Sequence, residues 1–249
     1  MRIDKYAACD NSFLIVMFND EEDYNFLAKT MCSKYDVDGL LVFRNDPIEM
    51  LVFNKDGSEA FMCGNGIRCL CHYLYDRFKI YKHLLVKTKS GNYECEIINT
   101  EPFISSVRLG LGEYVEGIFK ETIRIKEKEF LITGFELGVK HLMVLSDDFK
   151  EDIDHIEQIF EYPLFEKEFN ISLVNPLSHE VFEIITYERG VGFTNSCGTA
   201  AASCAYILHE EYNMDSNLIA ISPGGVLKID IEDEIILKGE SVYIESFEV

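Results

Sequence analysis

Short runs of apolar residues, separated by polar turns, dominate the first part of the chain. The run FLIVMF (13–18) suits a buried strand, and it is far shorter than the roughly 20 residues of a membrane-spanning helix. Two further apolar runs lie in DVDGLLVFRN (36–45) and IEMLVFN (48–54), with a short turn between them. They predict a pair of neighbouring strands.

Helical spacing replaces this pattern after residue 63. Apolar residues recur every three or four positions in GNGIRCLCHYLYDRF (64–78), and basic residues lie near its end, which favours a helix. A second helix is predicted for AAASCAYILHEEY (200–212), whose small residues suit close packing as a buried central helix. The segment EDIDHIEQIFE (151–161) predicts an additional amphipathic helix.

The chain contains an internal repeat. A shift of 134 residues (197 − 63) aligns the segment that starts at Ile48, IEMLVFNKDGSEAFMCGNGIRCLCHYL, with FEIITYERGVGFTNSCGTAAASCAYIL, which starts at Phe182. In this register Cys63 falls on Cys197, and a later glycine turn also matches. Because the register holds across both features, we infer a duplication rather than a coincidence.

These patterns predict an α+β fold of two pseudo-repeated halves with a cleft between them. Each half is expected to be a mixed or antiparallel sheet wrapped around one central helix. The boundary is expected near 110–116, where glycines cluster.

Composition and charge narrow the class of partner. The formal net charge is −21, from 44 Asp and Glu against 23 Lys and Arg. Such a field repels phosphate backbones and anionic lipid, which argues against nucleic-acid and membrane partners. Acidic residues flank the run 13–18, so it lacks the basic start of a signal peptide, and we expect a cytoplasmic protein.

Eight cysteines are too dilute for a disulfide scaffold. Cys69, Cys71 and His72 lie in a predicted helix at spacings that do not converge on a metal, and no second Cys or His pair completes a zinc site. We therefore expect no metal and no cofactor. Apart from Cys63 and Cys197, the cysteines are expected to be buried core thiols: Cys9, Cys32, Cys69, Cys71, Cys95 and Cys204.

Cys63 and Cys197 each precede a predicted helix at matched positions of the repeat. A thiol at a helix N-terminus loses its proton more readily, and the unpaired N–H groups there bind carboxylates. Two such thiols on opposite faces of an α-carbon could remove and return its proton, while the backbone amides stabilise the charge that develops. This arrangement predicts a cofactor-independent racemase or epimerase.

At these residues the sequence resembles the diaminopimelate epimerases. The motifs that carry the resemblance run nearly end to end: DNSF, FNKDGSEAFMCGNGIRC, YERGVGFTNSCGTAAASCA, PGG and KGESVYI. The resemblance implies isomerisation of LL- to meso-2,6-diaminopimelate in lysine and peptidoglycan-precursor biosynthesis. It also implies a homodimer and a C-terminal strand that returns to the first half. With the boundary from the glycine cluster, the halves are expected at 1–112 and 113–240, and the returning strand at 241–249.

The resemblance also implies roles for individual residues. Cys63 and Cys197 are the two bases, and His141 and Glu188 tune their thiols. Arg189 suits a distal carboxylate because a guanidinium can bind one bidentately. The residues implied to bind substrate, through backbone amides or side chains, are Asn11, Asn54, Gly64, Asn65, Asn170, Glu188, Arg189, Gly198 and Thr199.

Three positions depart from the family pattern. Ser12 replaces an aspartate, Val139 replaces an asparagine that contacts the far end of the substrate, and Gly39 replaces a substrate-lining glutamine. The predicted proton-transfer residues are all present, whereas the shell that recognises the distal end is thinner. Loss of a polar contact can change specificity by orders of magnitude.

Three alternatives stay open at this point. A racemase of another amino acid would keep the thiols and change the side-chain pocket. A non-catalytic protein that binds a carboxylate ligand would keep the fold without exchanging an α-proton. A redox sensor would join Cys63 and Cys197 in a disulfide, which mass analysis after mild oxidation would detect.

Overall fold

The computed structural model describes residues 2–80, 82–110, 117–165 and 168–248. It divides into two compact units, Met1–Arg108 with Lys238–Val249, and Leu109–Leu237. The boundary expected at 112/113 lies in 111–116, outside the described residues.

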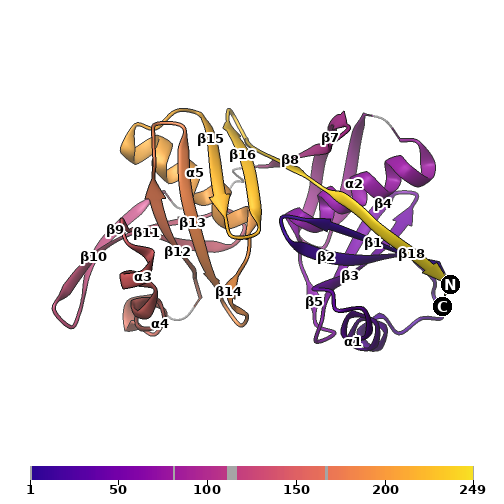
Figure 1. Cartoon of the computed structure of the whole chain (residues 1–249), viewed down its shortest axis with the longest axis horizontal. Helices are drawn as coiled ribbons and strands as arrows, with labels where there is room; N and C mark the ends of the chain where they lie inside the picture. The colour runs from indigo at the N-terminus through magenta and orange to yellow at the C-terminus, as the bar shows by residue number, and fades with distance from the viewer. Residues whose placement is uncertain (1, 81, 111–116, 166–167, 249) are drawn as a thin grey trace. The chain divides into compact units, whose positions relative to one another are not determined.

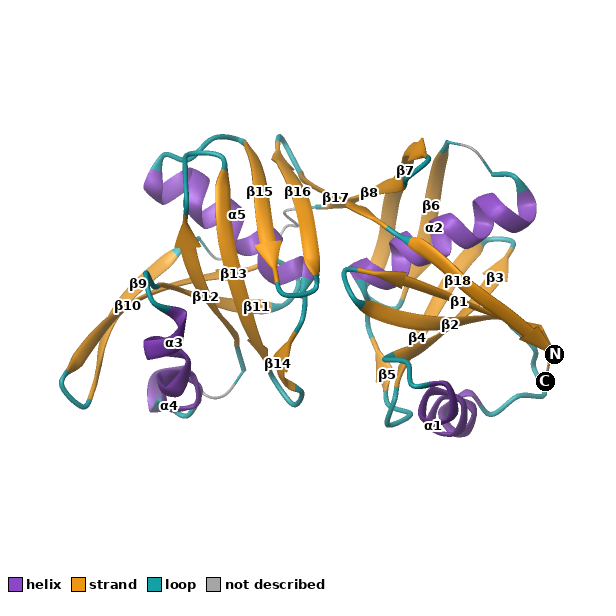
Figure 2. Ribbon diagram, in the orientation of Figure 1, coloured by secondary structure: helices purple, strands orange, loops and turns teal. Residues whose placement is uncertain are grey.

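The first unit is a mixed sheet with two helices (Figure 1, Figure 2). Its elements are β1 (Arg2–Ala8), β2 (Asn11–Met17), α1 (Tyr24–Tyr35), β3 (Gly39–Asn45), β4 (Ile48–Asn54), β5 (Glu59–Ala60), α2 (Gly64–Phe78), β6 (His83–Thr88), β7 (Gly91–Thr100), β8 (Phe103–Leu109) and β18 (Val242–Glu248). β1 is antiparallel to β18 and β2, and β2 is parallel to β3. β4 is antiparallel to β3 and parallel to β6.

The second unit repeats this plan. Its elements are β9 (Phe119–Ile125), β10 (Lys128–Glu136), β11 (Lys140–Leu145), α3 (Phe149–Asp152), η1 (Ile153–His155), α4 (Ile156–Phe160), η2 (Pro163–Phe165), β12 (Asn170–Pro176), β13 (Val181–Glu188), β14 (Gly192–Thr194), α5 (Gly198–Tyr212), β15 (Asn217–Ser222), β16 (Gly225–Ile231) and β17 (Ile235–Glu240). β10 is antiparallel to β9 and β11, and β11 is parallel to β12. β13 is antiparallel to β12 and parallel to β15. The prediction of an α+β fold with two pseudo-repeated halves is confirmed.

Each sheet holds one long buried helix. α2 packs against β1, β2 and β18, and α5 packs against β10, β11, β12, β15 and β16. The small residues Ala200, Ala201, Ala202 and Ser203 of α5 are all buried, as a helix closely covered by strands requires. β18 lies beside β1, so the C-terminal strand completes the sheet that the N-terminus begins (Figure 1).

The amphipathic helix predicted at 151–161 is broken in the structure. α3 begins at Phe149 because Asp148 caps it, and the 3₁₀ turn η1 separates it from α4. Ile153, Ile156 and Ile159 recur every three residues, a spacing that a tightened turn places on one face. All three pack on the apolar core of the second unit, which explains the break.

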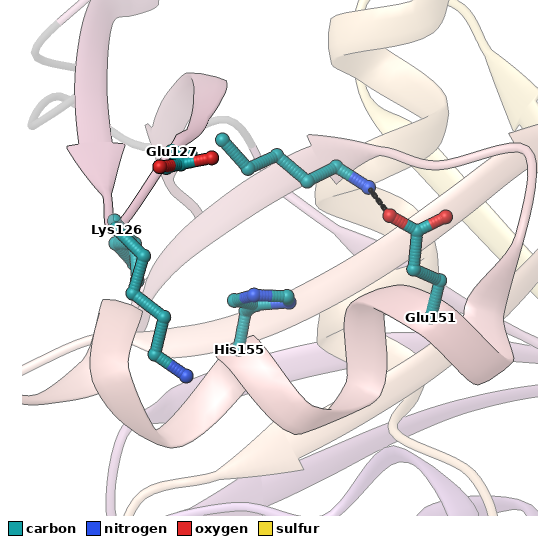
Figure 3. Close-up of a pocket in the computed structure, with 6 residues that line it drawn as sticks. Lys126, Glu127, Glu151 and His155 are labelled. Carbon is teal, nitrogen blue, oxygen red and sulfur yellow. Dashed lines mark hydrogen bonds and ion pairs between the residues drawn. The ribbon is translucent and has the colours of Figure 1, made fainter.

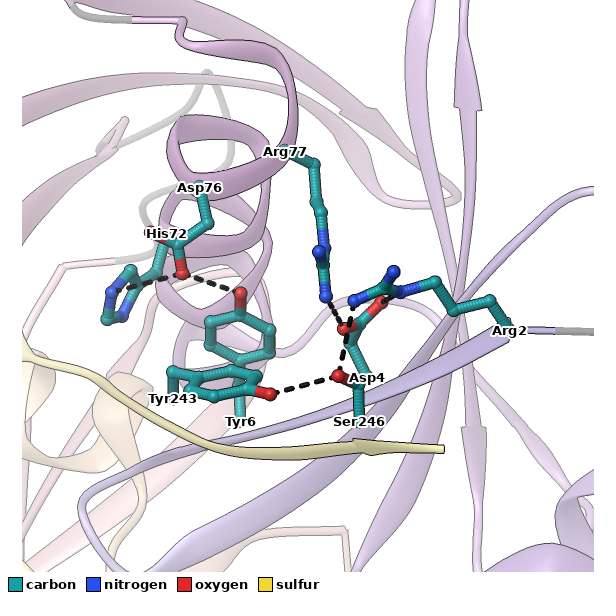
Figure 4. Close-up of polar contacts among 8 residues, drawn as sticks. All are labelled: Arg2, Asp4, Tyr6, His72, Asp76, Arg77, Tyr243 and Ser246. Atoms are coloured by element: carbon teal, nitrogen blue, oxygen red, sulfur yellow. Dashed lines mark hydrogen bonds and ion pairs between the residues drawn. The ribbon is translucent and has the colours of Figure 1, made fainter. Parts of the chain in front are cut away.

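A polar cluster ties α2 to β1 (Figure 4). The Tyr6 hydroxyl donates to Asp76 at 2.7 Å, and His72 Nε2 lies 3.6 Å from the same carboxylate. Burial, together with the neighbouring Asp76 carboxylate, raises the pKa of the Tyr6 phenol far above its usual range. The hydroxyl therefore remains a donor. The Tyr6 ring also meets Tyr243 of β18 edge-on, with 5.3 Å between ring centroids.

Asp4 belongs to the same region and supplies a stability test. Its carboxylate is 1% exposed and pairs with Arg77 and, at 3.3 Å, with Arg2. Asp4→Asn keeps the shape and removes the charge, so we expect the free energy of unfolding in urea to fall by about 2 kcal/mol. Asp36→Asn, which removes an exposed partner of Lys55, should lower it much less, because water screens an exposed ion pair. Equal losses in the two variants would contradict this ranking.

Candidate active site

Cys63 begins α2 in the first unit. It is the N-cap residue, with extended backbone (φ −145°, ψ 112°), and its sulfur accepts a hydrogen bond from Gly66 N at 3.3 Å. The thiol is half-buried, whereas Gly64 and Asn65 behind it are buried. An N-cap side chain lies against the unpaired N–H groups of the first turn, so Cys63 stands where an anion is stabilised.

The predicted binding residues Asn65 and Asn11 are in contact. Asn65 Nδ2 donates to Asn11 Oδ1 at 3.3 Å, which joins the first turn of α2 to the start of β2. Arg68, one turn into α2, donates to Asn65 Oδ1 at 2.5 Å and to Cys9 Sγ at 3.4 Å. The structure therefore brings Asn11, Asn65 and Cys63 to the same end of α2.

Asn54 ends β4, and its side chain forms a hydrogen bond within the turn that follows this strand. Asn54 Nδ2 donates to Ser58 Oγ at 3.0 Å, and its side chain is exposed. Asn54 has no hydrogen bond to Cys63 or Asn65 among the described residues, so its part in the site stays a prediction.

Cys197 takes the matching place in the second unit. It is the N-cap of α5, again with extended backbone (φ −122°, ψ 112°), and its sulfur lies 3.4 Å from Thr199 Oγ1. The thiol is half-buried, and Gly198 behind it is buried. Both repeats therefore present a cysteine as the N-cap of their long buried helix.

Glu188, at the end of β13, lies against Cys197. Thr194 Oγ1 donates to Glu188 Oε1 at 2.6 Å, and the Cys197 thiol also hydrogen-bonds to this carboxyl group. Burial raises the pKa of Glu188, and these two hydrogen bonds oppose the change. A carboxyl group shifted toward its neutral form beside a thiol is suited to sharing a proton with it.

His141 and Asn170 lie at the adjoining strand ends. His141 is wholly buried, neither ring nitrogen has a partner among the described residues, and burial lowers its pKa to about 3. It is paired in register with Asn170, which is 8% exposed. Asn170 Oδ1 accepts from the Arg189 backbone N at 2.9 Å, while the Arg189 side chain is exposed. Because burial lowers its pKa so far, His141 is neutral at physiological pH.

The strand-end residues of the two halves form matching rows. A shift of 134 (188 − 54) superposes Asn54 on Glu188, the last residue of each row. The first row runs across β2, β3 and β4 with the paired residues Phe13, Gly39 and Asn54. In the second row His141 of β11 pairs with Asn170 of β12, and Glu188 of β13 follows Tyr187, the partner of Ile171. The two halves thus share a scaffold and differ in chemistry, because the second row alone carries ionisable side chains.

Two of the family departures have a structural reason. A Cβ atom on Gly39 would lie 2.9 Å from Phe53 O and 3.3 Å from the Phe13 ring, so a longer side chain does not fit there. Ser12 donates through its backbone N at 2.7 Å and its hydroxyl at 3.3 Å to Asp38. Val139 is 40% exposed.

The sequence interpretation was wrong about Cys9 and overlooked two residues. Cys9 is half-buried rather than in the core, because it lies in the β1–β2 turn with φ 50°. Thr194 was not singled out; its only signal is its place three residues before Cys197. Arg68 stood within the quoted motif without a role. The other cysteines expected in the core are buried: Cys32, Cys69, Cys71, Cys95 and Cys204.

A surface pocket of about 680 Å³ lies elsewhere, beside the β9–β10 turn (Figure 3). None of its lining residues is a predicted site residue. Lys128 on its wall binds Glu151 at 2.9 Å. The residues that line it are Ile125, Lys126, Glu127, Lys128, Glu151 and His155.

Neither a metal cluster nor a membrane span is found in the part of the chain that the structure describes. No group of three His, Cys, Asp or Glu side chains there is placed to hold a metal ion. No helix among those residues is both long enough and apolar enough to cross a bilayer.

The decisive comparison covers most of the chain. The sequence model of the diaminopimelate epimerase family matches residues 5–115 and 135–244. The chain belongs to this family. Both N-cap cysteines, and the strand ends beside them, fall within the matched residues.

Individual members of the diaminopimelate epimerase family match nearly end to end. The diaminopimelate epimerase of Alkaliphilus metalliredigens is 29% identical, over 99% of this chain and 98% of its own. That of Clostridium perfringens is 30% identical, over 94% and 93%. Among solved structures, the phenazine biosynthesis protein of the PhzF family from Bacillus anthracis superposes with a TM-score of 0.71 at 17% identity, over 100% of this chain and 98% of that one. At that identity the likeness shows the fold alone.

Proposed function

We propose that this protein epimerises LL-2,6-diaminopimelate to meso-2,6-diaminopimelate, a step of lysine and peptidoglycan-precursor biosynthesis. The observation that carries the proposal is the matched pair of N-cap cysteines in a member of the diaminopimelate epimerase family. Cys63 and Cys197 are half-buried, so each thiol is reachable by a ligand while its helix N-terminus stays protected.

In this proposal the two thiols act on opposite faces of one α-carbon. One thiolate removes the α-proton and the other thiol delivers a proton, which inverts the centre. The first-turn amides at Gly64 and Asn65, and at Gly198 and Thr199, hold the reacting carboxylate and stabilise the charge that builds on it. All the groups that this chemistry needs are supplied by the chain, so the proposal includes no cofactor and no metal.

The second unit supplies the groups that set the state of Cys197. Glu188 shares a hydrogen bond with the thiol, and His141, which is wholly buried and neutral, is the second group that the proposal assigns to this role. In this proposal Asn170 and Arg189 bind the distal end of the substrate, and the exposed guanidinium of Arg189 suits its carboxylate. In the first unit, Asn11 and Asn54 would complete the binding shell.

The test is turnover of LL-diaminopimelate beside a panel of common L-amino acids, followed by chiral separation of the products. The proposal expects meso-diaminopimelate as the major product. Inversion of another amino acid instead would support the second candidate, a racemase with a different substrate. That candidate rests on Gly39, which has no room for a side chain, and on the exposed apolar Val139. If none of the tested amino acids is inverted, both candidate functions are contradicted.

We further propose that the protein works in the cytoplasm as a homodimer. All eight cysteines are thiols, which suits a reducing compartment. On β18, three consecutive residues are exposed, Val242 by 46% and Tyr243 and Ile244 by 45% each. Exposed apolar residues on a strand favour association with a second chain.

The dimer can be tested by light scattering after size exclusion. The wild type should have twice the mass of one chain, and Ile244→Lys should shift it toward the monomer, because a charge would be buried at the contact. Phe26→Lys, on the 65% exposed Phe26 of α1, is the matched control and should leave the mass unchanged. A monomeric wild type, or equal behaviour of the two variants, would contradict the β18 interface.

A further inference from the structure

Arg68 is a buried cation whose hydrogen-bond partners, within the described part of the chain, are all neutral. It is 0% exposed and is among the largest fully buried side chains. Its guanidinium donates to Gly64 O, Asn65 Oδ1 and Cys9 Sγ, and its Nε has no partner among the described residues. Burying a charge without a counter-charge is costly, so a side chain held in this way calls for an explanation.

The contacts of Arg68 fix the direction of two side-chain amides. A guanidinium can only donate, so Asn65 must turn its oxygen toward Arg68 and its NH₂ group toward Asn11. Asn11 then accepts with its oxygen, at 3.3 Å, and its own NH₂ group points away from Asn65. Arg68 thereby decides that Asn11 presents a donor, rather than an acceptor, to a ligand.

The second half of the repeat lacks this device. A shift of 134 places Ala202 opposite Arg68 (202 − 68) and Thr199 opposite Asn65 (199 − 65). Ala202 is buried in α5 and carries no charge. The extra positive charge is therefore specific to the helix that begins at Cys63, and Cys197 provides an internal comparison within the same molecule.

We propose that Arg68 is a positioning residue for the proton transfer, resting on the proposed function above. It orients the Asn65 amide, and through it Asn11, so that the NH₂ group of Asn11 is a donor toward the substrate carboxylate. Its permanent charge, folded back toward the N-terminus of α2, adds to the helix dipole and stabilises anionic Cys63 and the bound carboxylate. The Cys63 thiolate and the substrate carboxylate then supply the negative charge that the hydrogen-bond partners of Arg68 among the described residues lack.

The charge effect is tested without substrate, by following alkylation of Cys63 with iodoacetamide against pH and quantifying the Cys63 peptide by mass spectrometry. In Arg68→Met, the pH of half-maximal reactivity should rise by about one pH unit, because a nearby cation is lost. Arg68→Lys keeps the charge and should hold the wild-type midpoint. The Cys197 peptide of the same samples is the control and should move less than the Cys63 peptide. An unchanged Cys63 midpoint in Arg68→Met would overturn the charge effect.

The orienting effect is tested by kinetics. Arg68→Met should lower kcat/KM by about 100-fold, as misplacement of a binding group does. Arg68→Lys should lower kcat/KM by about 10-fold, because a single ammonium group cannot replace the several fixed N–H donors of the guanidinium. Asn65→Ala, which leaves Arg68 in place, should lower kcat/KM while keeping the Cys63 midpoint. Values within threefold of wild type in Arg68→Met would overturn the orienting effect.

The alkylation and kinetic experiments together distinguish a failure of this inference from a failure of the proposed function. If wild-type protein inverts no amino acid, the proposed function fails, and the alkylation midpoint still decides whether Arg68 acts on Cys63. Thermal unfolding provides the structural control: Arg68→Met removes a buried charge and should unfold at the wild-type temperature or above it. A large loss of stability that accounts for the lost activity would make Arg68 structural and contradict the proposal.

Discussion

Replacing either Cys63 or Cys197 with alanine is expected to lower kcat/KM for epimerisation by up to about 10⁴-fold, the upper range for loss of a general acid or base. Each thiol is the acid in one direction and the base in the other, so neither variant should retain the reaction in either direction. Both residues are half-buried N-caps, so the fold should survive the change. Steady-state kinetics with both stereoisomers measures the loss.

Cys204→Ala is the matched control for these two variants. Cys204 lies on α5 and is wholly buried, and burial raises the pKa of its thiol to about 12. Its replacement should leave kcat/KM within about threefold of wild type while lowering stability slightly, as a small core truncation does. Substantial activity in both Cys63→Ala and Cys197→Ala would contradict the paired-thiol mechanism, whatever the control does.

The second large effect is a loss of stability in acid that depends on His141. Its pKa in the folded state is about 3, lowered by burial, whereas the unfolded chain has the usual value of about 6.5. A lowered pKa contributes stability above the unfolded value, and that stability is lost as pH falls from about 6.5 toward 3. The loss attributable to His141 should be about 3 kcal/mol between pH 7 and pH 4, and about 4 kcal/mol between pH 7 and pH 3.

Urea unfolding of wild type and His141→Leu across this pH range measures the effect. The variant cannot take up the proton, so its free energy of unfolding should fall less steeply with acid, and the two curves should diverge only below about pH 6.5. His179→Leu, at an exposed histidine, should follow the wild-type curve. Parallel curves for His141→Leu and wild type would show that His141 is not held neutral by the fold.

Much of the fold was predictable because the two copies of the repeat keep the same order of helix starts and apolar positions. Cys63 and Cys197 each begin a helix, and the long helices follow from apolar spacing. The alternation of parallel and antiparallel pairing was not predictable, since a strand's pattern records which face is buried and not its neighbours. The break between α3 and α4 was missed because Ile153, Ile156 and Ile159 fit both a regular and a tightened helix.

The site was predictable where the motif itself provides the chemistry, and not where tertiary packing does. His141 lies between β10 and β12 on a strand against which α5 packs, so its burial depends on tertiary structure. The contact of Thr194 with Glu188 depends on the β13–β14 hairpin. Arg68 is a stronger case, because arginine is rarely fully buried and nothing in its local sequence indicates that it would be.

The most direct test of the central claim is conversion of LL-diaminopimelate in deuterated water, stopped within the first turnovers and analysed by mass spectrometry. Two thiols that exchange with solvent predict one deuterium at the inverted centre of every meso product, while the remaining LL substrate keeps its α-hydrogen. Product that retains the original α-hydrogen, or equal early labelling of substrate and product, would mean that a single group moves the proton. Either result would contradict the paired roles of Cys63 and Cys197.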